Sequence, residues 1–142
     1  MTAPLVPVQY GSPITLDAAK RIVAAAEAAA AERGWPMVIA IVDSGGRLVI
    51  LHRHEQAQLG SIDVAQQKAE TALRFKRPTK VFEDALVAGG MGLRFLSVPG
   101  VCMLEGGLPI MQDGRIIGAI GASGMQSSQD AEIANLGLKA LG

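Results

Sequence analysis

Hydrophobic positions recur along the chain with two periods, one typical of helices and one of strands. Helical spacing or composition predicts four helices, at residues 16–33, 61–77, 80–88 and 128–141. Apolar and β-branched runs bounded by Gly, Pro or Asp predict five strands, at residues 37–43, 47–52, 101–104, 108–112 and 115–123. The first strand is apolar almost throughout, which is typical of a strand buried on both faces.

Short turns connect the strands within each group. Ser44, Gly45 and Gly46 join the first two strands, and Asp113-Gly114 is typical of a type I′ hairpin between the last two. Tight turns favour antiparallel pairing. The order α-β-β-α-α-β-β-β-α therefore predicts an α+β fold, a five-stranded antiparallel sheet flanked by helices. We expect residues 1–14, with three prolines, to form an extended N-terminal arm and residues 15–142 to form a single domain.

Capping residues mark the ends of the expected helices. Thr15 is expected to cap the first helix and Gly34 to end it. Ser61 and Thr79 are expected to cap the next two helices. Before the last helix, Ser127 has capping-box spacing with Asp130.

The charge balance narrows the classes of partner. The 142 residues hold 13 Lys and Arg against 13 Asp and Glu, so no bulk field attracts nucleic acid or an anionic membrane. We see no apolar run of membrane-spanning length and no secretion signal, and we expect a cytoplasmic protein. The single cysteine, Cys102, allows no internal disulfide and is expected to be a small buried hydrophobe.

Lys68 is the first candidate for a ligand contact. It lies on the flank of the apolar stripe of the 61–77 helix, between Ala65 and Ala72, where small side chains let a ligand approach. This position suits an anion site. The alternative, favoured by residue type alone, is a lysine whose stem covers the core edge while its ammonium group stays in water.

The second candidate is the segment His52, Arg53, His54 and Glu55, which follows the second strand and holds both histidines of the chain. Residues two apart on a strand point to the same face, so the two imidazoles suit a metal or haem. The chain has neither an HExxH motif nor a Cys/His pairing, and we predict no dedicated metal site. The alternative is a polar strand end in solvent.

Four stretches together resemble the GlcG/HbpS family of haem-binding-like proteins, which also includes the C-terminal part of PduO-type proteins. They are IVDSGGRLV, SIDVAQQKAETALRFKRPT, GGLPI and GRIIGAIGASGMQSSQDAEIA, and the resemblance covers residues 15–141. It implies a profilin-like sheet, a homo-oligomer, and a pocket between subunits or along the sheet, lined by the lysine-bearing helix and the GGLPI loop. It also implies an accessory role in a catabolic pathway for small organic acids or diols. Where many relatives read RMDGA, this chain has HRHEQAQ.

Small-ligand binding is the leading hypothesis, with haem as the ligand that the family suggests. His52 or His54 would then be the axial donor, and Lys68 or Arg77 would contact the propionates. The low aromatic content, 4%, gives few rings to enclose a macrocycle. Another hypothesis is an accessory oligomer that carries out no chemistry.

The alternative is an isomerase, hydratase or lyase acting on a small carboxylate. Lys68 and Arg53 would hold the carboxylate, and His54 or Glu55 would move a proton. Amides at Gly106 and Gly107, or at Gly124, would stabilise developing negative charge. These glycines lie in or beside strands, and the GxxGxxG run at 118–124 lacks the dinucleotide-binding pattern.

Overall fold

A four-stranded antiparallel sheet forms the middle of the protein in the computed structural model, which describes residues 7–142. The strands are β1 (Val38–Asp43), β2 (Leu48–Arg53), β3 (Gly107–Gln112) and β4 (Arg115–Ser123), in the order β2-β1-β4-β3. The central strands β1 and β4 are buried along almost their whole length, which confirms the burial expected for the first strand. All three strand pairings are antiparallel, and the tight turns predict this for β1 with β2 and for β3 with β4.

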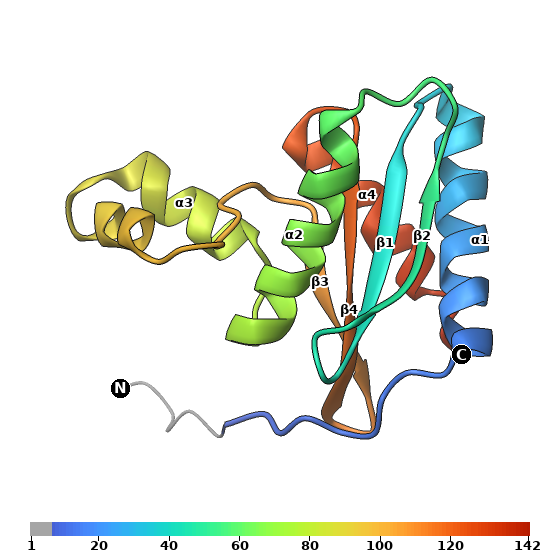
Figure 1. Cartoon of the computed structure of the whole chain (residues 1–142), viewed down its shortest axis with the longest axis horizontal. Helices are drawn as coiled ribbons and strands as arrows, with labels where there is room; N and C mark the ends of the chain where they lie inside the picture. The colour runs from blue at the N-terminus through green and yellow to red at the C-terminus, as the bar shows by residue number, and fades with distance from the viewer. Residues whose placement is uncertain (1–6) are drawn as a thin grey trace.

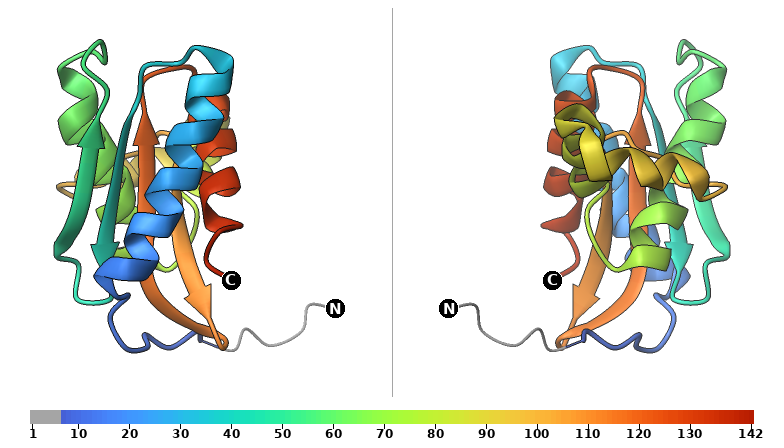
Figure 2. Two further views of the ribbon diagram at one scale, coloured as in Figure 1. Left: turned by 90° about the vertical axis from the view of Figure 1, so that its right-hand side faces the viewer. Right: turned by 90° about the vertical axis from the view of Figure 1, so that its left-hand side faces the viewer.

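Helices cover both faces of this sheet (Figure 1). Helices α1 (Leu16–Arg33) and α4 (Ser127–Leu138) pack side by side on one face, and α2 (Gly60–Phe75) packs on the other. Helix α3 (Lys80–Ala88) and the 3-10 helix η1 (Gly90–Ser97) pack on each other and project away from the sheet beyond α2 (Figures 1 and 2). The α+β class is confirmed.

The fifth strand expected at 101–104 does not form, so the prediction of five strands was wrong. This segment passes α2 instead of pairing with the sheet. The Cys102 amide donates to the Thr71 hydroxyl at 3.0 Å. A side chain of α2 thus replaces the strand partner that the amide would need. Cys102 itself is buried, as expected.

The ends of the helices confirm some capping predictions and correct others. Thr15 accepts from the Ala18 amide at 3.1 Å, and Gly34 ends α1 with φ +70°. Ser61 lies inside α2 and makes no cap, because Leu59 is the N-cap residue. Thr79 is the N-cap of α3, but its hydroxyl accepts from the Gly107 amide at 2.9 Å instead of capping.

The capping box before α4 is made by other residues than expected. Gln126 and Gln129 form it, one position before the predicted Ser127 and Asp130. The Asp130 side chain instead accepts from the Met125 amide at 2.9 Å and turns into the protein.

The segment preceding α1 runs extended along the sheet, and the first six residues of the predicted 1–14 arm lie outside the described residues. Tyr10 bridges Ile116 of β4, and its hydroxyl donates to the Leu73 carbonyl at 2.6 Å. Within residues 7–142, every helix is too short or too polar to cross a membrane.

Candidate functional site

A groove of about 600 Å³ opens where the C-terminal end of α1, the start of β1 and the loop after β2 meet. Most of its wall is apolar, and the polar side chains stand on two of its elements, α1 and the loop. The lining residues are Glu27, Ala28, Ala30, Ala31, Gly34, Trp35, Pro36, Met37, Ile39, His54 and Gln56.

The end of α1 creates one wall of this groove. Gly34 adopts the left-handed conformation that terminates the helix, and Trp35 then donates its amide back to the Ala30 carbonyl at 3.0 Å. The guanidinium carbon of Arg33 lies over the half-buried indole ring, 5.7 Å from the ring centroid. A cation over an aromatic face is attracted by the ring quadrupole. The turn thus fixes a flat apolar surface next to a positive charge.

His54 stands on the opposite side of the groove. Its amide donates to the Met37 carbonyl at 3.0 Å, so the strand pairing of β1 and β2 continues one residue beyond β2. Its ring nitrogen Nδ1 accepts from the Gln56 amide at 3.0 Å. Because Nδ1 is the acceptor, the proton of the neutral ring lies on Nε2. His54 is therefore a hydrogen-bond donor at Nε2.

His52 lies on the same face of the sheet as His54, as the alternation of the strand predicts. Its Nδ1 is 2.5 Å from the Glu27 carboxylate of α1. Glu27 also lines the groove, so the same carboxylate contacts His52 and faces the groove. The two histidines are thus close in the fold, but only His54 contributes to the groove wall among the described residues.

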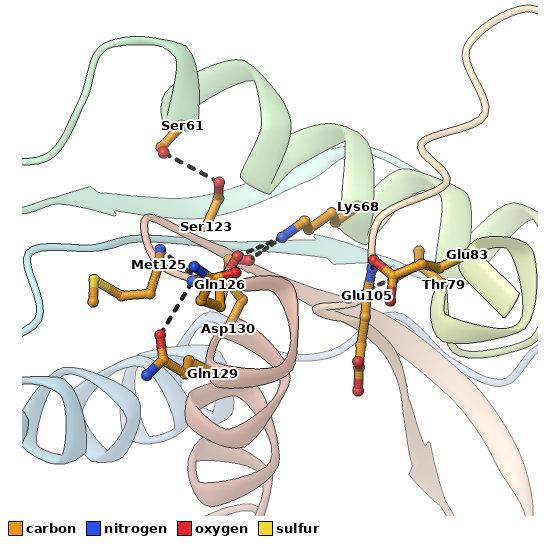
Figure 3. A network of polar contacts seen from close by, with 12 residues as sticks. Ser61, Lys68, Thr79, Glu83, Glu105, Ser123, Met125, Gln126, Gln129 and Asp130 are labelled. Atoms are coloured by element: carbon orange, nitrogen blue, oxygen red, sulfur yellow. Dashed lines mark hydrogen bonds and ion pairs between the residues drawn. The ribbon is translucent and has the colours of Figure 1, made fainter. Parts of the chain in front are cut away.

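Lys68 is buried, with 1% of its surface exposed, so the expectation of an ammonium group in water was wrong. Its Nζ donates to the Ala122 carbonyl at 2.9 Å and to Asp130 Oδ2 at 2.8 Å (Figure 3). Burial raises the pKa of Asp130, against the opposing hydrogen bond and charge of Lys68. This pair joins the middle of α2 to the first turn of α4.

Gly106 and Gly107 pack directly against Lys68, at the place where the resemblance implies a pocket lined by the GGLPI loop and the lysine-bearing helix. A Cβ atom at Gly106 would lie 2.8 Å from Lys68 Nζ, and one at Gly107 would lie 2.3 Å from the Lys68 carbonyl oxygen. The loop is therefore packed directly on the lysine-bearing helix. Three predicted site residues, Lys68, Gly106 and Gly107, thus pack on one another. None of them lines the groove to which His54 contributes.

The remaining predicted residues are spread over the surface. Arg53 and Glu55 are exposed beside His54. Arg77 is exposed beyond the C-terminal end of α2, and its Nε donates to the Phe75 carbonyl at 2.8 Å. The N-terminal end of α2 follows the loop that carries His54, so the length of a 16-residue helix, about 24 Å, separates Arg77 from this loop.

Gly124 lies beside the groove. A Cβ atom there would be 2.6 Å from the carbonyl oxygen of Pro36, which lines the groove. Its role is therefore close packing of the turn after β4 against the start of β1. Across residues 7–142, no cluster of three or more His, Cys, Asp or Glu side chains is arranged to hold a metal ion.

Sequence reasoning missed Glu27, Trp35 and Gln56 in the groove and Asp130 as the partner of Lys68. Trp35 carried a usable signal, since it is the single tryptophan of the chain and directly follows the glycine that ends α1. Asp130 carried none, because 62 residues separate it from Lys68.

Comparison with known proteins gives a family match over most of the chain. The family described as "Haem degrading protein HbpS-like" matches residues 14–139. Among curated proteins, GlcG of Escherichia coli strain K12 is 37% identical over 105 residues, which cover 74% of this chain and 77% of GlcG.

Solved structures give the same match in three dimensions. A double mutant of HbpS from Streptomyces reticuli superposes with a TM-score of 0.85 at 28% identity, covering 100% of this chain and 99% of that one. A complex of PduOC with haem superposes with a TM-score of 0.82 at 29% identity, covering 90% of this chain and 94% of that one.

Proposed function

The chain belongs to the HbpS-like family, and on that premise we propose that it binds haem or a similar planar tetrapyrrole in the groove beside α1. The observation that carries the proposal is the groove itself, which combines an apolar wall with one imidazole donor. A structural relative, PduOC, has been solved as a complex with haem, which supports the ligand class.

The residues of the groove fit such a ligand. Its volume of about 600 Å³ lies within the range of small-molecule pockets. Trp35, Met37 and Ile39 would contact the apolar macrocycle, while His54 lines the groove where a carboxylate side group would reach it. Haem would supply iron-centred chemistry when bound. The residues of the chain would orient the ring and keep water from one of its faces.

The test is a hemin titration followed by the Soret band, on wild type and on a variant with a filled groove. Ala31 lines the groove from the exposed side of α1, so Ala31→Trp places an indole in the proposed site. Ala24→Trp is the matched control, because Ala24 is exposed two turns earlier on the same helix and does not line the groove.

We expect wild type and Ala24→Trp to show a saturable Soret band at one equivalent, and Ala31→Trp to lose it. Equal binding by both variants would place the ligand elsewhere and contradict the groove. A broad absorbance that does not saturate in wild type would contradict haem binding itself. Circular dichroism of each variant checks that the fold is retained.

Two further expectations belong to this proposal. The homo-oligomer and the accessory role in a catabolic pathway were implied by the resemblance, and both stay predictions. The alternative of an enzyme acting on a small carboxylate also stays a hypothesis. Lys68 is held by Asp130 at 2.8 Å, so it would have to leave that ion pair before it could hold a substrate carboxylate.

A further inference from the structure

We propose that His54 holds the tetrapyrrole by donating a hydrogen bond from Nε2 to a propionate carboxylate, and that it is not the axial ligand of the iron. This inference rests on the proposed function and specifies how the groove recognises its ligand. It makes the carboxylate side group, and not the metal, the feature that His54 selects.

The hydrogen bond to Gln56 decides between the two roles. An imidazole that ligates iron uses the lone pair of one nitrogen, and the other nitrogen then carries the proton. At His54 the Gln56 amide donates to Nδ1 at 3.0 Å, so Nδ1 cannot carry a proton without losing this bond. The remaining proton is on Nε2, which therefore has no lone pair to offer the iron.

The same geometry prepares His54 as a donor. The loop bond occupies one ring nitrogen and leaves the other, Nε2, for a ligand. A carboxylate is the strongest partner for such a donor, because a hydrogen bond to a charged acceptor is shorter and stronger than one between neutral groups. Propionates are the carboxylate groups of a haem-like tetrapyrrole.

Glu27 fixes the direction in which a carboxylate can lie. It lines the groove with a negative charge that contacts His52 Nδ1 at 2.5 Å. His54 follows His52 by two residues, roughly 7 Å along an extended chain. A propionate at the His54 end of the groove therefore meets less repulsion than it would beside Glu27. The apolar part of the ring would then face the apolar wall of the groove.

The consequence is that the iron is not needed for this contact. Metal-free protoporphyrin IX carries the same propionates as haem and offers no metal to ligate. We expect it to bind wild type within about threefold of the haem affinity. Esterification of the propionates removes the charged acceptor, so the dimethyl ester should bind more weakly and should not respond to changes at position 54.

The experiment measures the affinity of hemin, protoporphyrin IX and protoporphyrin IX dimethyl ester for wild type, His54→Ala and His54→Gln in one solvent. Fluorescence follows the metal-free ligands and the Soret band follows hemin. We expect His54→Ala to weaken both free-acid ligands about tenfold and to leave the ester unchanged. His54→Gln, whose amide can still donate, should recover most of the loss without moving the Soret maximum.

The outcomes separate this inference from the proposed function. If His54→Ala weakens hemin alone and shifts its Soret maximum, or if it changes neither free-acid affinity, the inference is wrong while groove binding stands. If no porphyrin binds wild type saturably, the proposed function has failed. A loss for both free acids, a recovery in His54→Gln and an unresponsive ester together support the propionate contact.

Discussion

The ion pair of Lys68 and Asp130 shows at the scale of single residues how a buried charge can be tolerated. Lys68 Nζ has two oxygen partners, Ala122 and Asp130, within 2.9 Å. The other oxygen of Asp130 accepts from the Met125 amide. Both charges are removed from water, so each depends on the other, and the loss of one would leave an uncompensated charge in the interior.

We therefore expect Lys68→Met to destabilise the fold strongly. Removing one member of a buried ion pair typically costs about 3–5 kcal/mol, because the remaining charge stays desolvated. Urea unfolding of the variant would measure this loss. In the double variant Lys68→Met/Asp130→Asn neither charge remains, and the asparagine oxygen can still accept from the Met125 amide.

The double variant is thus the control for the ion pair. Its loss should be smaller than the sum of the two single losses by at least about 1 kcal/mol. Additive losses would show that the two side chains act independently and would contradict the account given for the pair.

The sequence indicated Lys68 as special but could not indicate why. Its position beside small alanines followed from helical spacing, and that part was right. Its partner comes from α4, and only the folded sheet brings the two helices together. The groove was not predicted for the same reason: only folding brings its two walls together. Glu27 and Trp35 lie before β1 in the sequence, while His54 and Gln56 follow β2.

At the scale of elements, the contact between α2 and β4 depends on a glycine. A Cβ atom at Gly121 would lie 2.0 Å from the Ala65 carbonyl oxygen and 2.7 Å from the Ala69 nitrogen. The backbone of the helix thus lies directly on the backbone of the strand. This explains the middle glycine of the GxxGxxG run, because a glycine inside a strand lets another backbone approach closely.

Gly121→Ala is expected to destabilise the protein, because the added methyl group must push α2 away from the sheet. Overpacking a core in this way typically costs about 1–3 kcal/mol, and a contact with rigid backbone falls at the upper end. Gly60→Ala at the start of α2 is the matched control, since a Cβ atom there meets nothing within 4 Å.

The control should be neutral or gain about 0.4–1 kcal/mol, because alanine lowers the entropy of the unfolded chain. Thermal or urea unfolding of both variants makes the comparison. Equal stability of the two would mean that α2 can shift freely on β4, which is inconsistent with the close packing.

Local sequence signals predicted the elements well wherever the conformation depends on residues that are neighbours in the sequence. The bounds of α1 and α3 agree with the expected 16–33 and 80–88, and Asp113 and Gly114 both have the positive φ of the predicted hairpin. The prediction of a fifth strand was wrong because a strand needs a neighbouring strand with which its backbone can form hydrogen bonds. Residues 101–104 have a suitable composition, but a hydroxyl of α2 satisfies their backbone.

At the scale of the whole molecule, the projecting pair α3 and η1 carries an unusual amount of exposed apolar surface. Its large exposed side chains are Val81, Val87, Met91, Leu93 and Leu96. Phe82 of α3 meets Phe95 of η1 and Phe75 of α2 edge to face, so an aromatic cluster joins the pair to the end of α2. Exposed apolar surface gathered on one feature is typical of a protein–protein contact, so we expect this arm to contact another subunit of the predicted homo-oligomer.

Charge placed on the arm should therefore dissociate the assembly without unfolding the subunit. We expect Met91→Glu/Leu96→Glu to lower the mass measured by light scattering after size exclusion, because an interface would have to desolvate both carboxylates. The two side chains are 73% and 64% exposed, so the subunit itself should lose little stability.

Leu59→Glu is the control for this experiment. Leu59 is 74% exposed, and it lies at the N-terminal end of α2, away from the arm. The control should keep the mass of wild type, which separates a specific contact from a general effect of added charge. A wild type that is already monomeric, or an arm variant with unchanged mass, would show that α3 and η1 do not assemble the protein. Because the groove beside α1 lies on the opposite side of the sheet from α2 and the arm, the dissociated variant should still bind hemin with the affinity of wild type.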